Sequence, residues 1–267
     1  MFFLKFLSAT FLGAFVGKFM GMIIFYLPQI LLEGCEKGRE PRDIFKWILE
    51  KPFCKSCKHP LSWMEAAPIA GYFFVNGKCL HCGFSLKRYF LLELEMGLLF
   101  GLMLSFPITP TMLFILLVTC LLICCFFTDF DYSILPDQLT LTLVWVGLIG
   151  SLFPIFLSPQ EAIAGAVAGY GIFWMINEIY RYFRGREGMF PGDFKLNAGV
   201  GACIGIQLLF PVLAIALLLL IGFSLIKLIY FKKLSTLDFL KKEVAYGCYL
   251  SLVAIGTFYL KFFGIIN

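Results

Sequence analysis

Long apolar runs separated by short polar stretches dominate the pattern along this 267-residue chain. A bilayer core of roughly 30 Å needs about 20 apolar residues per helix, and about eight segments approach that length. The predicted helices lie near residues 4–31, 90–107, 111–128, 139–157, 161–180, 194–207, 209–230 and 244–264. The pattern therefore predicts an all-α polytopic membrane protein.

Two of these segments need interpretation. The segment 194–207 is short, so it is either tilted or continuous with the next segment through a kink at Pro211. The first segment exceeds the apolar core of a signal peptide and lacks a clean small-residue cleavage site, so we expect a retained span. The chain then divides into a first helix (1–31), a polar insertion (32–89) and a membrane domain (90–267).

Charge predicts the orientation of these helices. Hydrophobic residues make up 60% of the chain, which indicates the lipid bilayer as its surroundings. Lysine and arginine concentrate in the loops 32–89, 181–193 and 231–243, whereas the loops near 107–110 and 157–160 have none. Basic loops stay in the cytoplasm, so both termini are expected outside. This bias accounts for the net charge of +5, and nucleic acid is not predicted as a partner.

The polar insertion contains two CxxC pairs, Cys54/Cys57 and Cys79/Cys82, separated by 21 residues. Each pair can direct two thiolates at one tetrahedral ion. Stable disulfides are rare in the reducing cytoplasm, and the insertion has little apolar core of its own. We therefore predict a structural zinc with a closed four-thiolate shell. The two histidines, His59 and His81, can substitute as ligands, although roles around the site or at the surface are favoured.

Acidic residues gather at the ends of two apolar segments. Asp129 and Asp131 follow the segment 111–128, and Asp193 precedes the segment 194–207. Two carboxylates that meet can share a proton, so that one deprotonates a water while the other protonates a peptide carbonyl. Ordinary interfacial acids and the carboxylates of a transporter remain alternatives. Asp137, just before the segment 139–157, is expected to be a helix N-cap.

Small residues predict where helices approach closely. Gly165 and Gly169 form a GxxxG pattern, and Gly199, Gly201 and Gly205 give the segment 194–207 a small face. Glycines allow close helix contact in lipid. Such packing can hold the aspartate-bearing ends near each other.

Five stretches occur in a specific order along the chain: Gly17–Pro28, the paired CxxC motifs with Asn76-Gly-Lys-Cys79, Arg88-Tyr89 followed by Glu93 and Gly97, Asp129–Thr140, and Gly192–Leu196. Together they resemble the type IV prepilin peptidases, which are bacterial membrane aspartic proteases of the GxGD type. The resemblance covers most of the chain.

The resemblance implies a two-step activity at the bacterial inner membrane. Such enzymes remove the basic leader peptide of prepilins and pseudopilins at the cytoplasmic face. Many then methylate the new N-terminal amine with S-adenosylmethionine. Carried over by motif, Asp129 and Asp193 are the catalytic pair, and Asp131 competes with Asp129 for the first position.

Several positions depart from the family pattern. Phe190 stands where the first glycine of GxGD is usual, and Phe90 replaces a proline after Arg88-Tyr89. Gly21 and Tyr26 replace an asparagine and an arginine of the first span. We predict a prepilin leader peptidase with N-methyltransferase activity. The alternatives are a carboxylate-dependent transporter and, because of Phe190, a catalytically inactive assembly factor.

Overall fold

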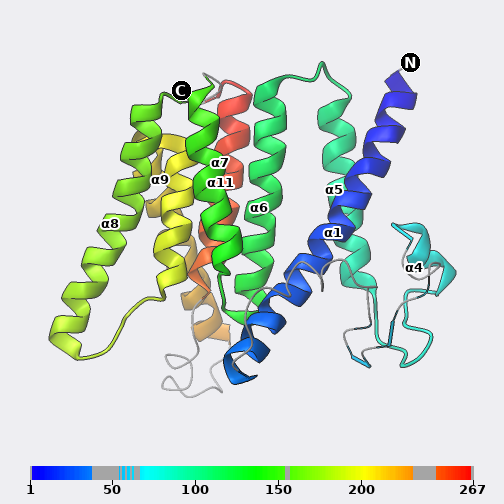
Figure 1. Ribbon diagram of the computed structural model, residues 1–267, viewed down its shortest axis with the longest axis horizontal. Helices are drawn as coiled ribbons and strands as arrows, with labels where there is room; N and C mark the ends of the chain where they lie inside the picture. The colour runs from blue at the N-terminus through cyan, green and yellow to red at the C-terminus, as the bar shows by residue number, and fades with distance from the viewer. Residues whose placement is uncertain are drawn as a thin grey trace. The chain divides into compact units, whose positions relative to one another are not determined.

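The computed structural model describes residues 2–37, 54, 56–57, 59–60, 62, 67–153, 157–230 and 245–265 (Figure 1). The helices in this part of the chain are α1 (Phe2–Lys37), α4 (Ala70–Phe74), α5 (Lys87–Leu104), α6 (Pro110–Tyr132), α7 (Asp137–Leu152), α8 (Pro159–Arg184), α9 (Pro191–Tyr230) and α11 (Tyr246–Phe262). An antiparallel bridge joins Lys78 and Ser85. The predicted all-α class is confirmed for the described residues.

Four of the described helices are long and apolar enough to cross a membrane. They are Phe3–Leu32, Pro110–Tyr132, Pro159–Arg184 and Pro191–Lys227, and α7 is a shorter apolar helix. Much of their outward surface consists of exposed leucine, isoleucine and phenylalanine. Such a surface suits lipid rather than water, so the chain is a multi-pass membrane protein.

The two predicted segments 194–207 and 209–230 form one element, α9, with a break inside it. The break lies at Gly205, where φ is +81° and ψ is 167°, and Pro211 remains within the helix. The expected kink at Pro211 is therefore wrong in position. A positive φ of this kind is readily adopted by glycine but rarely by other residues, so the break falls where the sequence has a glycine.

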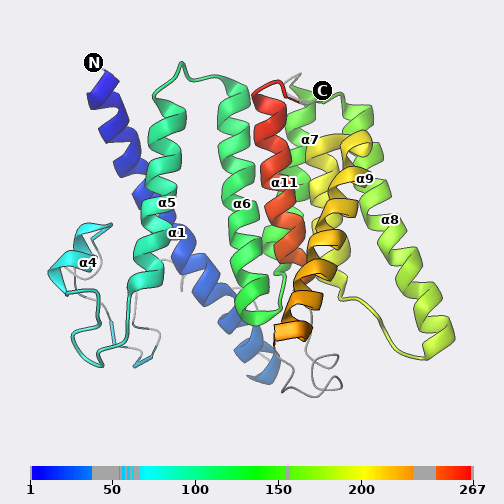
Figure 2. The same ribbon diagram turned by 180° about the vertical axis from the view of Figure 1, so that it is seen from behind.

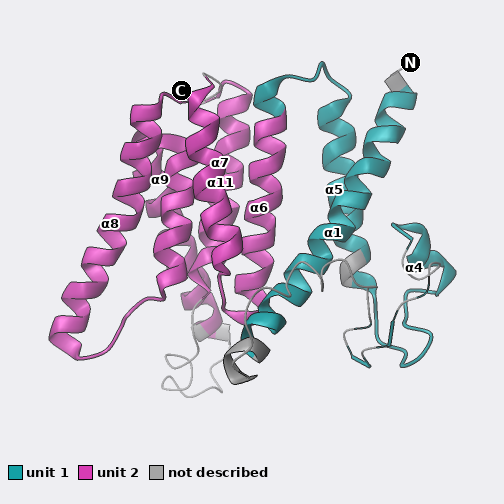
Figure 3. Cartoon of the chain, viewed as in Figure 1, with its two compact units in different colours: residues 1–112 teal, residues 113–267 magenta. Residues whose placement is uncertain are grey.

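The chain forms two compact units, residues 1–112 and 113–267 (Figure 3). In the first unit, α1 packs directly against α5. A Cβ at Gly17 would lie 2.9 Å from the Cα of Glu93, and a Cβ at Gly97 would lie 3.1 Å from the Thr10 carbonyl oxygen. These two glycines belong to the motifs that carry the family resemblance, and here they permit close helix approach.

In the second unit, the first half of α9 packs against α7, α8 and α11 (Figures 1 and 2). A Cβ at Gly165 of α8 would collide with the main chain of Gly201, and one at Gly169 would collide with the Asn197 carbonyl. On the other side, a Cβ at Gly199 would lie 2.9 Å from the Leu143 side chain of α7. The predicted small-residue packing is confirmed, and it fixes the start of α9 between its neighbours.

Gly165→Ala should destabilise the protein, because its Cβ would overlap the Gly201 main chain and overpacking costs about 1–3 kcal/mol. The matched control is Gly171→Ala on the same helix, where a Cβ meets nothing within 4 Å. That change should be neutral or slightly stabilising, because alanine favours helix over glycine. Thermal unfolding in detergent measures both variants. Equal midpoints would contradict the packing argument.

Candidate active site and metal centre

Asp129 lies in the last turn of α6, and its side chain is buried, with 5% of the residue surface exposed. The helix ends nearby because Ser133 adopts φ +51° and donates its N–H to the Asp129 carbonyl at 2.8 Å. A left-handed residue in this position is a common helix terminator. A carboxylate at the carboxyl end of a helix faces the negative end of the helix dipole, so it needs donors from elsewhere in the fold.

The first turn of α11 supplies such a donor. The Cys248 N–H donates to Asp129 Oδ2 at 3.0 Å, and the Cys248 thiol donates to the Phe126 carbonyl of α6 at 3.2 Å. Main-chain N–H groups in the first turn of a helix lack partners within that helix. The buried carboxylate therefore sits against the amino-terminal end of α11, which carries partial positive charge.

Asp193 lies in the first turn of α9. Its Oδ2 accepts the Phe190 N–H at 3.3 Å, while its own N–H donates to the Phe190 carbonyl at 3.0 Å. The contact between the Asp193 side chain and the Phe190 N–H is the acidic half of a capping box. Phe190 is not among the non-glycine residues with positive φ in the described chain. Phenylalanine therefore occupies this position without the backbone strain that would make glycine necessary.

The structure brings the two predicted aspartates together. A Cβ at Gly247 of α11 would lie 2.9 Å from Asp129 Oδ2 and 3.1 Å from Leu196 Cδ2, and Leu196 is one turn along α9 from Asp193. Asn197, one turn along α9 and fully buried, donates from Nδ2 to the Asp193 carbonyl at 2.8 Å and accepts the Tyr246 hydroxyl at 3.0 Å on Oδ1. The end of α6 and the starts of α9 and α11 thus converge on one small volume that contains both carboxylates.

The other two acids differ in position. Asp137 was expected to be the N-cap of α7, but Pro136 occupies that place with an extended backbone and Asp137 is in the first turn. Asp137 Oδ1 instead accepts from Lys195 Nζ of α9 at 2.6 Å. Asp131 is half-buried in the last turn of α6, and a separation of two residues places it about 200° around the helix axis from Asp129.

Sequence reasoning missed the polar residues that support the site. Asn177 of α8 is buried, and its Oδ1 accepts the N–H groups of Gly188 at 2.9 Å and Met189 at 3.0 Å. It therefore holds the chain that leads into Asp193. Asn177 and Asn197 both interrupt apolar helices, and a polar side chain in such a place is a signal that could have identified them.

The four cysteines of the two CxxC pairs gather in the first unit. Their Sγ atoms all lie within 4.8 Å of one another. The Cys54–Cys82 distance is 3.5 Å and the Cys57–Cys79 distance is 4.0 Å. A tetrahedral zinc with thiolates at about 2.3 Å requires sulfur–sulfur distances of roughly 3.8 Å. The cluster has the number, chemistry and spacing of ligands that such an ion needs.

Local main-chain structure shapes the second cysteine turn. The Cys79 N–H donates to the Phe84 carbonyl, and the Gly83 N–H donates to the Cys79 carbonyl, both at 2.9 Å. Gly83 has φ +71°, which suits glycine in a tight turn. The two histidines are not part of the cluster, and the rings of His59 and His81 pack against each other at 4.6 Å.

The thiols differ in how readily they ionise. Burial raises the pKa of Cys54 to about 12. A hydrogen bond from the main chain of Phe84 lowers the pKa of Cys82 to about 7. A divalent cation favours the thiolate form of every cysteine that it contacts. Four adjacent thiolates repel one another in the absence of a metal. Around a divalent cation, all four thiols can therefore ionise.

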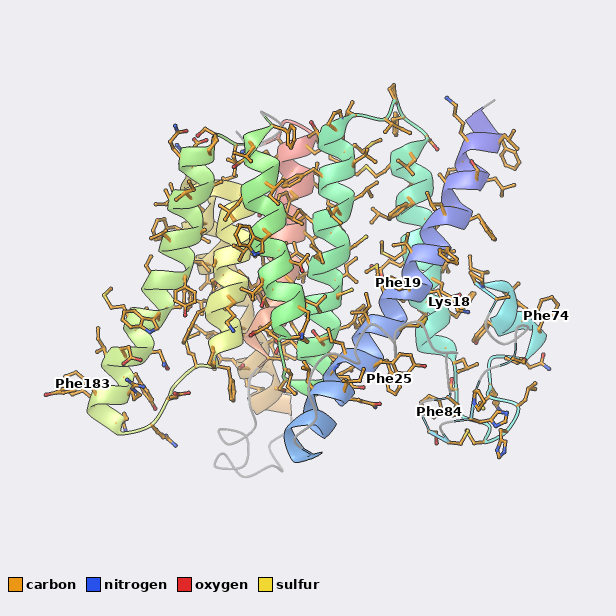
Figure 4. All side chains as sticks on the ribbon, in the orientation of Figure 1. Lys18, Phe19, Phe25, Phe74, Phe84 and Phe183 are labelled. Carbon is orange, nitrogen blue, oxygen red and sulfur yellow. The ribbon has the colours of Figure 1, made fainter. Side chains whose placement is uncertain are left out.

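A buried carboxylate connects the cysteine region to the helix pair of the first unit. Glu93 of α5 accepts the Ile69 N–H at 2.6 Å, and Ile69, directly before α4, has φ +56°. Positive φ is a strained conformation for a β-branched residue. Lys18 of α1, labelled in Figure 4 where α1 crosses α5, interacts with the charge of Glu93.

Known proteins match both units. The Bacterial Peptidase A24 N-terminal domain matches residues 11–106, and the Type IV leader peptidase family matches residues 114–226. A protein of Neisseria gonorrhoeae is 36% identical over 217 residues, which cover 77% of this chain and 76% of that protein. A protein of Aeromonas hydrophila is 34% identical over 252 residues, which cover 89% of this chain and 84% of that protein. Both are named prepilin leader peptidase/N-methyltransferase.

The chain belongs to the type IV leader peptidase family. The family predicted from the ordered motifs is thereby confirmed. The N-terminal match contains the four cysteines, and the leader peptidase match contains Asp129 and Asp193. The boundary between the two matches falls near the boundary between the two compact units. No solved structure matches the chain.

Proposed function

We propose that this member of the leader peptidase family cleaves the basic leader of type IV prepilins and pseudopilins and then N-methylates the new terminus. Similar proteins from several bacteria carry the name prepilin leader peptidase/N-methyltransferase, and the chain is an enzyme of that kind. The single observation that supports the proposed chemistry is geometric: the first turn of α11 contacts both Asp129 of α6 and the start of α9, which carries Asp193.

Asp129 and Asp193 would act as an acid–base pair in peptide hydrolysis. The ionised carboxylate takes a proton from water while the water oxygen attacks the peptide carbonyl carbon. The protonated partner gives its proton to the carbonyl oxygen. Collapse of the tetrahedral intermediate breaks the C–N bond, the departing amine receives the proton taken from water, and the second carboxylate takes back a proton from a hydroxyl group of the intermediate. Both carboxylates are regenerated in their starting states.

The methyl transfer step is a separate chemistry. S-adenosylmethionine, the donor implied for N-methyltransferases, supplies a methyl group to an amine through its sulfonium. The departures at Gly21, Tyr26 and Phe90 lie on α1 and α5 in the first unit, away from the pair formed by Asp129 and Asp193 in the sequence. Methylation is therefore proposed to be independent of the two carboxylates.

The two alternatives lose support. A transporter needs carboxylates along its permeation path, whereas Asp129 and Asp193 sit at the ends of α6 and α9. An inactive assembly factor was suggested by Phe190, but this residue adopts an ordinary backbone and donates its N–H to the Asp193 side chain. The peptidase proposal explains both the position of the acids and their contacts.

Asp129→Asn and Asp193→Asn should each lower the cleavage rate of a purified prepilin by roughly 1,000-fold or more, because a proton-sharing pair acts as a unit. Mass spectrometry of the pilin N-terminus reports cleavage. The control variants Asp131→Asn and Asp137→Asn should lose much less. Methylation of a pilin that has already been cleaved should survive in both dyad variants.

Full cleavage by either dyad variant would refute this assignment. Loss of cleavage with Asp131→Asn but not with Asp129→Asn would move the first catalytic position by two residues. If the wild type cleaves the prepilin but never methylates it, the methyl transfer part of the proposal fails alone.

We further propose that Cys54, Cys57, Cys79 and Cys82 hold one structural zinc. Four thiolates close the coordination shell, so this ion has no position for a reactive water and supports folding of the insertion. With this zinc, the insertion 32–89 would form a domain distinct from the first helix, 1–31, and from the peptidase domain, 90–267.

Elemental analysis of the purified protein should find about one zinc per chain. Cys79→Ser should remove most of it, because three thiolates leave the shell open. Cys120→Ser, which changes a cysteine of α6 outside the cluster, should leave the zinc content unchanged. A zinc-free protein that stays folded and active would contradict the structural role.

The proposed location is the bacterial inner membrane, with about eight spans if the two halves of α9 count separately. The basic loops would face the cytoplasm and both termini the outer side. Of these loops, 231–243 lies outside the described residues. Impermeant thiol labelling of cysteines introduced at each end of the chain should modify both in intact spheroplasts. Protection of the C-terminal cysteine alone would show that the span count is wrong by one.

A further inference from the structure

Three consecutive residues at the start of α11 reach both aspartate-bearing helices. Cys248 donates its N–H to Asp129 Oδ2 at 3.0 Å. Tyr246 donates its hydroxyl at 3.0 Å to Asn197, whose side chain donates at 2.8 Å to the Asp193 carbonyl. Figure 2 shows α11 between α6 and α9. One helical turn therefore connects the two halves of the catalytic pair.

Gly247, between these two residues, has no room for a side chain unless its neighbours move. A Cβ there would lie 2.9 Å from Asp129 Oδ2, and 3.1 Å from both Leu135 Cδ1 and Leu196 Cδ2. The Cα of Gly247 is therefore the point where three parts of the protein come together: the Asp129 carboxylate, the loop after α6 and the start of α9. All three atoms are the far ends of side chains, so a methyl group can be accommodated by moving them.

We propose that this first turn, Tyr246–Cys248, is the positioning element of the catalytic site. The Cys248 N–H holds the Asp129 carboxylate by a hydrogen bond. Because Gly247 has no side chain, that carboxylate can lie close to Asp193. Gly247 and Cys248 are positioning residues, because they act through Asp129. The inference rests on the proposed peptidase function.

The physical reason is the precision that acid–base catalysis demands. Catalytic groups must be held within about 0.5 Å of the productive geometry. The side chain of Asp129 would otherwise rotate about its own bonds at the end of α6. An N–H in the first turn of a helix can restrain it without giving up a hydrogen bond of the helix.

This role predicts a loss of activity without a loss of stability. In Gly247→Ala, the new methyl group displaces the carboxylate and the two leucine ends, while the backbone keeps its course. The matched control is Gly256→Ala on the same helix, where a Cβ meets nothing within 4 Å. With a purified prepilin as substrate, Gly247→Ala should lower kcat by about tenfold or more, with KM changed little, whereas Gly256→Ala cleaves like the wild type.

A second pair of variants tests the hydrogen bond. Cys248→Pro removes the N–H that donates to Asp129. Proline is tolerated in the first turn of a helix, because an N–H there has no hydrogen-bond partner within the helix. Cys248→Ala removes the thiol but keeps the N–H. The proline variant should lose roughly 100-fold in kcat, and the alanine variant should cleave at least about tenfold faster than the proline variant. Thermal unfolding in detergent is measured for all four variants.

The inference is overturned if Gly247→Ala cleaves as fast as Gly256→Ala, or if the two Cys248 variants cleave at equal rates. It is also overturned if the loss of activity in Gly247→Ala follows an equal loss of folded protein. Failure of the underlying function looks different, because then the wild type does not cleave, or Asp129→Asn cleaves fully. If Cys248→Pro does not fold, the glycine pair decides the matter.

Discussion

The structure of the second unit depends on how one buried carboxylate finds hydrogen-bond partners. Asp129 lies inside the protein at the carboxyl end of α6, where its charge faces the unfavourable end of the helix dipole. A buried charge without donors is costly, so the fold must supply them. The Cys248 N–H does so, and this single hydrogen bond requires the start of α11 to meet the end of α6. The capped start of α9 then completes the cluster through Asn197 and Tyr246.

Small residues make that convergence possible. Helices in lipid gain little from the hydrophobic effect when they associate, so close packing and hydrogen bonds hold them together. Gly165 and Gly201 let α8 and α9 touch main chain to main chain, and Gly199 receives Leu143 of α7. These contacts hold the start of α9 in place from both sides. The orientation of Asp193 follows from this packing as well as from its own hydrogen bonds.

Much of the fold and the positions of the acids and cysteines could be predicted, because apolar length, CxxC spacing and ordered motifs are local signals. What could not be predicted depends on contacts between distant residues. Asp129 and Cys248 are separated by 119 positions, and no periodicity indicates which turn of α11 will face the carboxylate. Asp137 was predicted as an N-cap from its neighbours alone, whereas its partner Lys195 lies 58 residues away. The break in α9 falls at Gly205, where φ is positive, and proline was the wrong guide to it.

The break at Gly205 also divides α9 into two halves that tolerate different amino-acid substitutions. The half before the break presents Gly199 and Gly201 to its neighbours, and a Cβ at either position would meet main chain or a packed side chain. The half after it exposes residues such as Leu218, Ile221 and Ile229, which need only be apolar to suit lipid. Over evolutionary time the exposed positions of the second half should therefore exchange one aliphatic residue for another freely, while Gly199 and Gly201 tolerate almost no increase in volume.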